Sequence, residues 1–254
     1  MQICPLGSGS SGNSIYLRAG ETHLLIDAGI PGQIIARSLA TLGVAIADIA
    51  GILITHEHSD HLRGIPLLAR KYNLPVYASS GTADELAWML PDNVDVRRLS
   101  PEGARFDDID VRPFSVPHDA ADPVGFIFEY DGMRVAMATD LGCVTREVKK
   151  AISGCQVIVL ESNHDEDMLA TGPYPEYLKQ RIRSRYGHLS NRQAADALKN
   201  AWHEDLRHVI LAHLSRENND PILARDTVSE AFNDDGRPAI HLTAHYEVGP
   251  FLEI

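Results

Sequence analysis

Short hydrophobic runs alternate with longer amphipathic segments along the chain. The run 49–55 (IAGILIT) predicts a buried strand, and the runs 133–139 (MRVAMAT) and 206–213 (LRHVILAH) predict two more. Apolar residues recur at helical spacing in 191–202 and in 31–43, which has a proline near its start and a glycine at its end. This alternation of short strands with helices predicts a fold of the α/β (α+β) class.

Two pairs of neighbouring runs predict β-hairpins. Residues 13–20 (NSIYLRAG) and 22–29 (THLLIDAG) form one pair, and 124–130 and 133–139 form the other, joined by the Asp-Gly dipeptide that favours a type I′ turn. Two halves that each contain helices and strands, with consecutive hairpins, predict sheets in the middle and helices on both outer faces. The sequence contains no repeat and no long linker, so we expect a single domain over residues 1–254.

Composition agrees with an ordinary globular protein. Hydrophobic residues make up 44% of the chain and charged residues 23%, and no apolar run approaches the roughly 18–20 residues of a membrane helix. The first residues have neither the basic nor the apolar region of a signal peptide. The three cysteines, Cys4, Cys143 and Cys155, lack metal-ligand spacing and predict free thiols. We therefore expect a cytoplasmic protein without a membrane partner.

The net charge of −12 limits how the protein could bind a phosphate polymer. General surface attraction is excluded, so positive charge has to come from bound metal or from a local basic patch. One such patch has no acidic residue within it and comprises Lys179, Arg181, Arg183 and Arg185. A solvated helix face explains these residues equally well.

The stretch ITHEHSDHLRG (residues 54–64) concentrates donors that suit a divalent metal: His56, His58, Asp60 and His61. If the segment is extended, His56, His58 and Asp60 point the same way because side chains alternate in a strand. His61 then points elsewhere and is available to a second ion.

Three further polar residues each follow a hydrophobic run. His118 comes after DVRPFSVP, Asp140 after MRVAMAT, and His213 after LRHVILA. A strand-end histidine alone is more often structural. Three such residues in order after the histidine cluster predict one shared metal centre.

These residues together resemble the metallo-β-lactamase superfamily, which has a four-layer αββα sandwich, and the resemblance covers nearly the whole chain. It implies two divalent ions, and it implies that Asp27 in LLIDAG supports the site from behind. The metal is not fixed by the sequence, because imidazole and carboxylate ligands accept zinc, manganese or iron. The implied ligands are His56, His58 and His118 for one ion, Asp60, His61 and His213 for the other, and Asp140 as the bridge between them.

Later motifs resemble the phosphodiesterase branch of this superfamily. In VIVLES and GHLSNRQAADAL, the resemblance assigns Glu161 and His188 to a pair that helps the leaving oxygen depart. GHLSN also predicts a helix start with Ser190 or Asn191 as its N-cap, which is compatible with that role. The segments GSGSSGNSIYL, PHDAADPVGF and ESNHD are similar to the YycJ/WalJ (VicX) group of bacterial proteins, to which DNA exonuclease activity is attributed.

The resemblance therefore implies a metal-dependent hydrolase acting on DNA rather than RNA. Hydrolysis would use a hydroxide that bridges the two ions and is oriented by Asp60. Asp140 and His213 are only 73 positions apart, which leaves no room for a large inserted domain, and no glycine- or proline-rich arm is present to hold tRNA. The alternatives are a small-molecule (cyclic) phosphodiesterase, another metallo-hydrolase such as a thioesterase, and a non-catalytic metal-binding regulator.

For three other features, the sequence leaves two interpretations open. His164 in ESNHDEDM is either an extra ligand or substrate contact, or a solvent-facing loop residue. Ser215 is either a donor to phosphate or a turn residue. The glycine-rich segment 8–13 either offers backbone N–H groups to phosphate or forms a tight hairpin.

Overall fold

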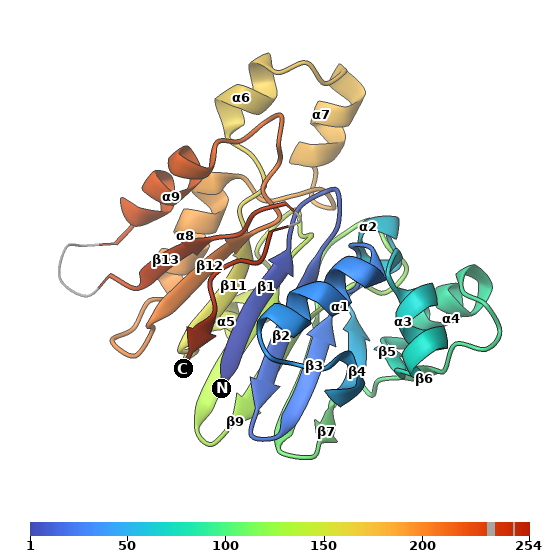
Figure 1. Ribbon diagram of the computed structural model, residues 1–254. Helices are drawn as coiled ribbons and strands as arrows, with labels where there is room; N and C mark the ends of the chain where they lie inside the picture. Colours follow the sequence, from blue (N-terminus) through green and yellow to red (C-terminus); the bar gives the residue numbers. More distant parts are fainter. Residues whose placement is uncertain (233–236, 246) are drawn as a thin grey trace.

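The computed structural model describes residues 1–232, 237–245 and 247–254, and within them two seven-stranded mixed sheets pack face to face with helices on both outer sides (Figure 1). This is the four-layer αββα sandwich that the sequence predicted. The segment PILARDTVSEAFN (residues 221–233) predicts a helix, and its last residue lies outside the described residues.

The first sheet has the strand order β14-β1-β2-β3-β4-β5-β6. The predicted hairpin between residues 13 and 29 is confirmed, because β2 and β3 pair antiparallel, whereas β3, β4, β5 and β6 pair parallel. The strands are β1 (Gln2–Gly7), β2 (Ser14–Ala19), β3 (Thr22–Ile26), β4 (Ile49–Ile54), β5 (Val76–Ala78), β6 (Val96–Arg98) and β14 (Leu252–Glu253).

The second sheet has the order β13-β12-β11-β10-β9-β8-β7. Asp131 and Gly132 join β9 to β10 with φ angles of 48° and 75°, which confirms the predicted type I′ turn. Strands β10 to β13 pair parallel. The strands are β7 (Ala104–Phe106), β8 (Ile109–Ser115), β9 (Val124–Tyr130), β10 (Met133–Ala138), β11 (Val157–Glu161), β12 (His208–Ala212) and β13 (Ala239–Leu242).

Helices cover the outer faces of both sheets. Side chains of α1, α3 and α4 pack on the first sheet, and those of α5, α8 and α9 pack on the second. None of the described helices is long and apolar enough to cross a membrane. The helices are α1 (Gly32–Thr41), the 3₁₀ helix η1 (Ile46–Asp48), α2 (Ser59–Leu62), α3 (Ile65–Tyr72), α4 (Ser80–Met89), α5 (Arg146–Ile152), α6 (Glu166–Thr171), α7 (Glu176–Arg183), α8 (Asn191–Ala201) and α9 (Pro221–Ser229).

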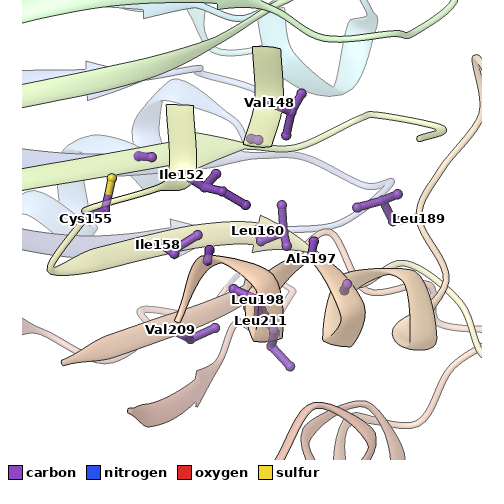
Figure 2. Close-up of a cluster of buried hydrophobic side chains, with 14 of the residues drawn as sticks. Val148, Ile152, Cys155, Ile158, Leu160, Leu189, Ala197, Leu198, Val209 and Leu211 are labelled. Carbon is purple, nitrogen blue, oxygen red and sulfur yellow. The ribbon is translucent and has the colours of Figure 1, made fainter. Parts of the chain in front are cut away.

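Apolar side chains fill the layer between the second sheet and its helices. Figure 2 shows Ile152 of α5 and Leu198 of α8 pointing at Leu160 of β11 and Leu211 of β12, and all four are at most 1% exposed. Burying such a side chain stabilises the fold by about 1.5–3 kcal/mol. The packed layer therefore fixes the positions of the strand ends from which the polar residues of the candidate site project.

Candidate metal centre

Three histidines from two loops form a first group of ligand atoms. His56 lies just after β4, His58 lies two residues on, and His118 lies in the loop after β8. One ring nitrogen of each lies within 4.8 Å of the others. Burial and repulsion from neighbouring histidines lower the pKa of His56 well below its ordinary value, and burial lowers the pKa of His118. Both rings are therefore neutral near pH 7 and offer a lone pair to a metal.

A second group consists of Asp60, His61 and His213, again with ligand atoms within 4.8 Å of one another. Our expectation that residues 56–60 form one extended segment is wrong for Asp60, because α2 begins at Ser59. The helical turn places Oδ2 of Asp60 3.7 Å from Nε2 of His61 and 3.7 Å from Nε2 of His213. Asp60 thus groups with His61 rather than with His58.

Asp140 lies between the two groups. Its Oδ2 is 3.4 Å from Nε2 of His61, and its Oδ1 is 3.9 Å from Nε2 of His118. The side chain is 3% exposed, so its charge is removed from water. A carboxylate in this position is close enough to serve both groups.

Among the described residues, several buried polar atoms of this cluster have no hydrogen-bond partner. They are Nε2 of His56, His118 and His213, and Oδ2 of Asp140. Each unpaired buried polar atom costs about 1–3 kcal/mol, and buried polar groups in folded proteins are normally paired. These atoms all face the same cluster and are of the types that bind divalent metals. The residues therefore fit a metal site.

Asp27 supports the cluster from behind, after β3. Its Oδ1 accepts a hydrogen bond from the backbone N of Thr55 (2.9 Å), and its Oδ2 lies 2.8 Å from Nδ1 of His61. This bond fixes the His61 ring with Nε2 toward the ligand groups. Burial opposes protonation of His61, but the charges of Asp27 and Asp140 outweigh it and raise the pKa of His61 to about 9 in the metal-free protein.

Glu161, at the end of β11, holds two histidines with one oxygen. Its Oε1 lies 2.7 Å from Nδ1 of His188 and 2.8 Å from Nδ1 of His213. Its Oε2 accepts from the backbone N of Leu141 and of Leu189. Burial alone would raise the pKa of Glu161, but interactions with His188 and His213 outweigh burial and hold it below its ordinary value. The buried group therefore remains a carboxylate.

His188 sits at the entrance to α8 with its side chain 20% exposed. The predicted cap at this helix is confirmed for Ser190, whose side chain accepts from the backbone N of Gln193 while the side chain of Gln193 accepts from the backbone N of Ser190. Asn191 is the first helical residue instead. The cap fixes the start of α8 and with it the position of the His188 ring.

Three residues of the site adopt left-handed backbone conformations: Asp27 (φ 59°), Asp140 (φ 57°) and His213 (φ 57°). Aspartate tolerates this region, but a histidine there is uncommon. Each lies within two residues of the end of a strand. The left-handed conformation therefore changes the direction in which its side chain leaves the strand end. Backbone strain of this kind concentrates at functional sites.

Sequence reasoning missed Asn13, in the glycine-rich turn. Its Nδ2 lies 3.1 Å from Nε2 of His61, and its backbone N donates to the backbone O of Asp60. Its Oδ1 accepts a hydrogen bond from the backbone N of Gly9. The backbone N–H of Gly9 is therefore bonded within the turn. The side chain of Ser8 also accepts from the backbone N of His213 (2.8 Å). The turn thus contacts the loop that carries His61 and the loop that carries His213. The run of glycines was the sequence feature that could have pointed to this turn.

The remaining candidates lie outside the ligand groups. His164 is 2% exposed, which rules out the solvent-facing alternative, and its Nδ1 has no partner among the described residues. Ser215 accepts a hydrogen bond from the backbone N of Asn218 through its hydroxyl, as a turn residue does. Lys179 of the basic patch is buried and donates to the backbone O of Ala170, so it is not part of a solvated face.

A pocket of about 170 Å³ opens over the cluster. Four of the histidines described above line it, together with residues of α7. The lining residues are Ser10, His58, Asp60, His118, Asp119, Asp140, Leu178, Arg181, Ile182, Gly187, His188 and His213.

Residues 22–214 match the family model described as the beta-lactamase superfamily domain. The chain belongs to the beta-lactamase superfamily. It is 41% identical over 234 residues to "Exodeoxyribonuclease YycJ" of Bacillus anthracis, covering 91% of this chain and 89% of that protein. It is 39% identical over 233 residues to "Exodeoxyribonuclease WalJ" of Streptococcus pneumoniae, covering 88% and 85%. These matches confirm the resemblance to the YycJ/WalJ group.

Solved structures with little sequence identity to this chain agree with it in fold. The metallo-beta-lactamase fold protein YhfI from Bacillus subtilis superposes with a TM-score of 0.79 at 14% identity, covering 99% of each chain. Human tRNase Z, short form, superposes with a TM-score of 0.63 at 19% identity, covering 85% of this chain and 93% of that one. At such identities the likeness concerns the fold alone.

Proposed function

We propose that this protein is a metal-dependent exodeoxyribonuclease that hydrolyses phosphodiester bonds in DNA. The observation that carries the proposal is the pairing of His188 with Glu161 at 2.7 Å beside buried ligand atoms that lack partners. The names of the YycJ and WalJ relatives support DNA as the substrate. We also propose that residues 1–254 act as one domain, and the free thiols of the three cysteines support a cytoplasmic location.

The chain offers ligands for two divalent ions of zinc or manganese, with iron as a further option. We assign His56, His58 and His118 to one ion and Asp60, His61 and His213 to the other, with Asp140 shared between them. Bound ions in such a pair lower the pKa of an attacking water and offset the charge that grows on the phosphoryl oxygens. Asp60, with its side chain 20% exposed at the pocket, would orient that water.

His188 would give a proton to the oxygen that leaves phosphorus. Its Nδ1 is held by Glu161, so Nε2 is the atom left to face the pocket that the ring lines. The contact with the buried carboxylate orients the ring, so that Nε2 is the nitrogen placed to deliver a proton to the leaving oxygen. General acid help of this kind typically contributes about 10²–10⁴-fold to the rate.

The test is digestion of end-labelled single- and double-stranded DNA and RNA by protein loaded with defined metals. Bis(p-nitrophenyl) phosphate and a thioester are assayed in parallel. Release of mononucleotides from DNA supports the proposal. Turnover of a small or cyclic phosphodiester without digestion of any nucleic acid contradicts it and favours the small-molecule alternative.

The variant His58→Ala distinguishes a catalytic function from that of a non-catalytic, metal-binding regulator. This change removes one ligand from a half-exposed position, so the fold should survive. Loss of both turnover and biological effect supports catalysis. Full retention of the biological effect without turnover would favour the regulator.

A further inference from the structure

Helix α7 and the loop after it form one wall of the pocket over the metal centre. Leu178, Arg181 and Ile182 line the pocket from the helix, and Gly187 lines it from the loop. The wall is tied to the site, because the backbone O of Gly187 accepts from Nδ1 of His118 (3.2 Å). Helices α6 and α7 lie at the same end of the molecule as α2, beyond the ends of the sheets (Figure 1). A ligand that extends from the pocket on this side would lie against this wall.

Two tyrosines on the wall are unusually exposed. Tyr177 is 74% exposed and Tyr186 is 55% exposed. Each is the immediate chain neighbour of a pocket-lining residue, Leu178 and Gly187 respectively. Tyrosine rings normally bury most of their apolar surface. Exposed rings beside a reaction pocket are suited to stacking on flat ligand groups, and nucleobases stack in this way whatever their sequence.

The charge of the wall is opposite to that of the protein as a whole. Residues 177–187 contain four basic and no acidic residues, whereas the net charge of the protein is −12. Lys179 is buried, so the exposed cations of this segment are Arg181, Arg183 and Arg185. Arg181 pairs with Asp119 (2.7 Å from Nε to Oδ2), and this pair holds its guanidinium at the pocket while the side chain remains 58% exposed. Arg185 is exposed in the loop. Exposed rings and guanidinium groups on one segment are suited to the bases and phosphates of a nucleic-acid strand.

We propose that residues 177–187 bind the DNA strand that extends from the metal centre. Tyr177 and Tyr186 stack on bases at the end of the strand, while Arg181 and Arg185 contact its phosphates. The proposal rests on the proposed exodeoxyribonuclease function and adds the substrate form: a DNA end whose last bases are unpaired or fray from the duplex. A blunt, stable end offers only the outer face of its terminal base pair, whereas two rings that stack on separate bases need unpaired bases, so such an end is bound less well.

Binding is measured by fluorescence anisotropy with a labelled single-stranded oligonucleotide, in EDTA so that nothing is cleaved. Tyr177→Ala and Tyr186→Ala should each raise Kd about fivefold or more, and Phe at either position should restore binding because the ring is kept. Arg185→Ala should reduce the slope of log K against log salt by about 0.7. The matched controls are Trp88→Ala, which removes a ring 88% exposed on α4, and Arg37→Ala, which removes an exposed charge on α1.

The same variants are then assayed on DNA and on bis(p-nitrophenyl) phosphate with metal present. The proposal expects the ratio of kcat/KM for DNA to kcat/KM for the small ester to fall in both alanine variants and to recover with Phe. If the wild type digests DNA but has the same Kd as both alanine variants, the proposal that residues 177–187 bind the strand is wrong, and the exonuclease proposal is unaffected. Equal weakening by Trp88→Ala would also overturn strand binding by this segment. Failure of the wild type to digest any nucleic acid would refute the proposed function itself.

Discussion

Oε1 of Glu161 lies 2.8 Å from Nδ1 of His213, whose Nε2 faces the metal centre. The same oxygen lies 2.7 Å from Nδ1 of His188, the proposed general acid. One buried carboxylate thus orients a ligand and a proton donor together. Disturbing Glu161 should therefore affect metal binding and proton transfer at once, whereas disturbing His188 should affect proton transfer alone.

Glu161→Gln is expected to weaken metal binding and to slow turnover. The amide lacks the negative charge that orients His213, and loss of such a supporting partner typically costs 10–100-fold in metal affinity or activity. Metal content is measured by elemental analysis after dialysis against buffered metal. Glu166→Gln is the control, because Glu166 is exposed, and its carboxylate accepts from the Ser190 hydroxyl and pairs with Arg192 rather than with a ligand. Wild-type metal content and turnover in Glu161→Gln would refute the dual role.

His188→Ala should leave metal content intact and slow the cleavage of a native-like oligonucleotide by about 10²–10⁴-fold. The loss should be much smaller on bis(p-nitrophenyl) phosphate, since p-nitrophenolate departs without a proton. His203→Ala is the control, because His203 bonds the backbone O of Cys155 near the start of β11, at the opposite end of that strand from Glu161. Unchanged turnover on the oligonucleotide would remove His188 from the mechanism.

The layers and much of the site were predictable because both depend on local pattern. Continuous apolar runs gave the buried strands, the Asp-Gly turn gave the β9–β10 hairpin, and polar residues following those runs gave the candidate ligands. The contact of Asn13 with His61 was not predictable, because it joins residues 48 positions apart and depends on the path of a loop. The left-handed conformation of His213 was not predictable either, since nothing in its neighbours' side-chain pattern encodes it.

Metal binding to the second ligand group should release protons near neutral pH. The pKa of His61 in the metal-free protein is about 9, above its ordinary value, so the folded protein is stabilised by protonation and that contribution is lost as pH rises through about 9. A metal needs the unprotonated ring and competes with this proton. Metal affinity should therefore rise between about pH 7 and 9, with proton release seen by calorimetry in buffers of different ionisation enthalpy. Asp27→Asn should move the rise to lower pH; an affinity that does not change over this range would contradict the assignment.

Gly29→Ala is expected to lower the free energy of unfolding and to weaken metal binding. A Cβ at Gly29 would clash with the backbone O of Asp60, so the loop that carries Asp60 has to move. Such overpacking typically costs about 1–3 kcal/mol. Gly43→Ala is the control: its φ of 74° gives strain from the left-handed backbone, but nothing lies within 4 Å of the added Cβ. Chemical denaturation and metal content should show a stability loss in both variants and a metal loss in Gly29→Ala alone.

The three thiols should differ sharply in reactivity. Burial raises the pKa of Cys4 to about 11 and that of Cys155 to about 12, and the thiolate is the form that attacks disulfide reagents. At pH 8 the folded protein should therefore react with Ellman's reagent at the half-buried Cys143, while Cys4 and Cys155 stay protonated and shielded. Cys143→Ser should abolish the fast phase, and guanidinium should expose all remaining thiols. If all three thiols of the folded protein reacted equally fast, β1, which carries Cys4, and the turn between α5 and β11, which carries Cys155, would have to open far more readily than their packing implies.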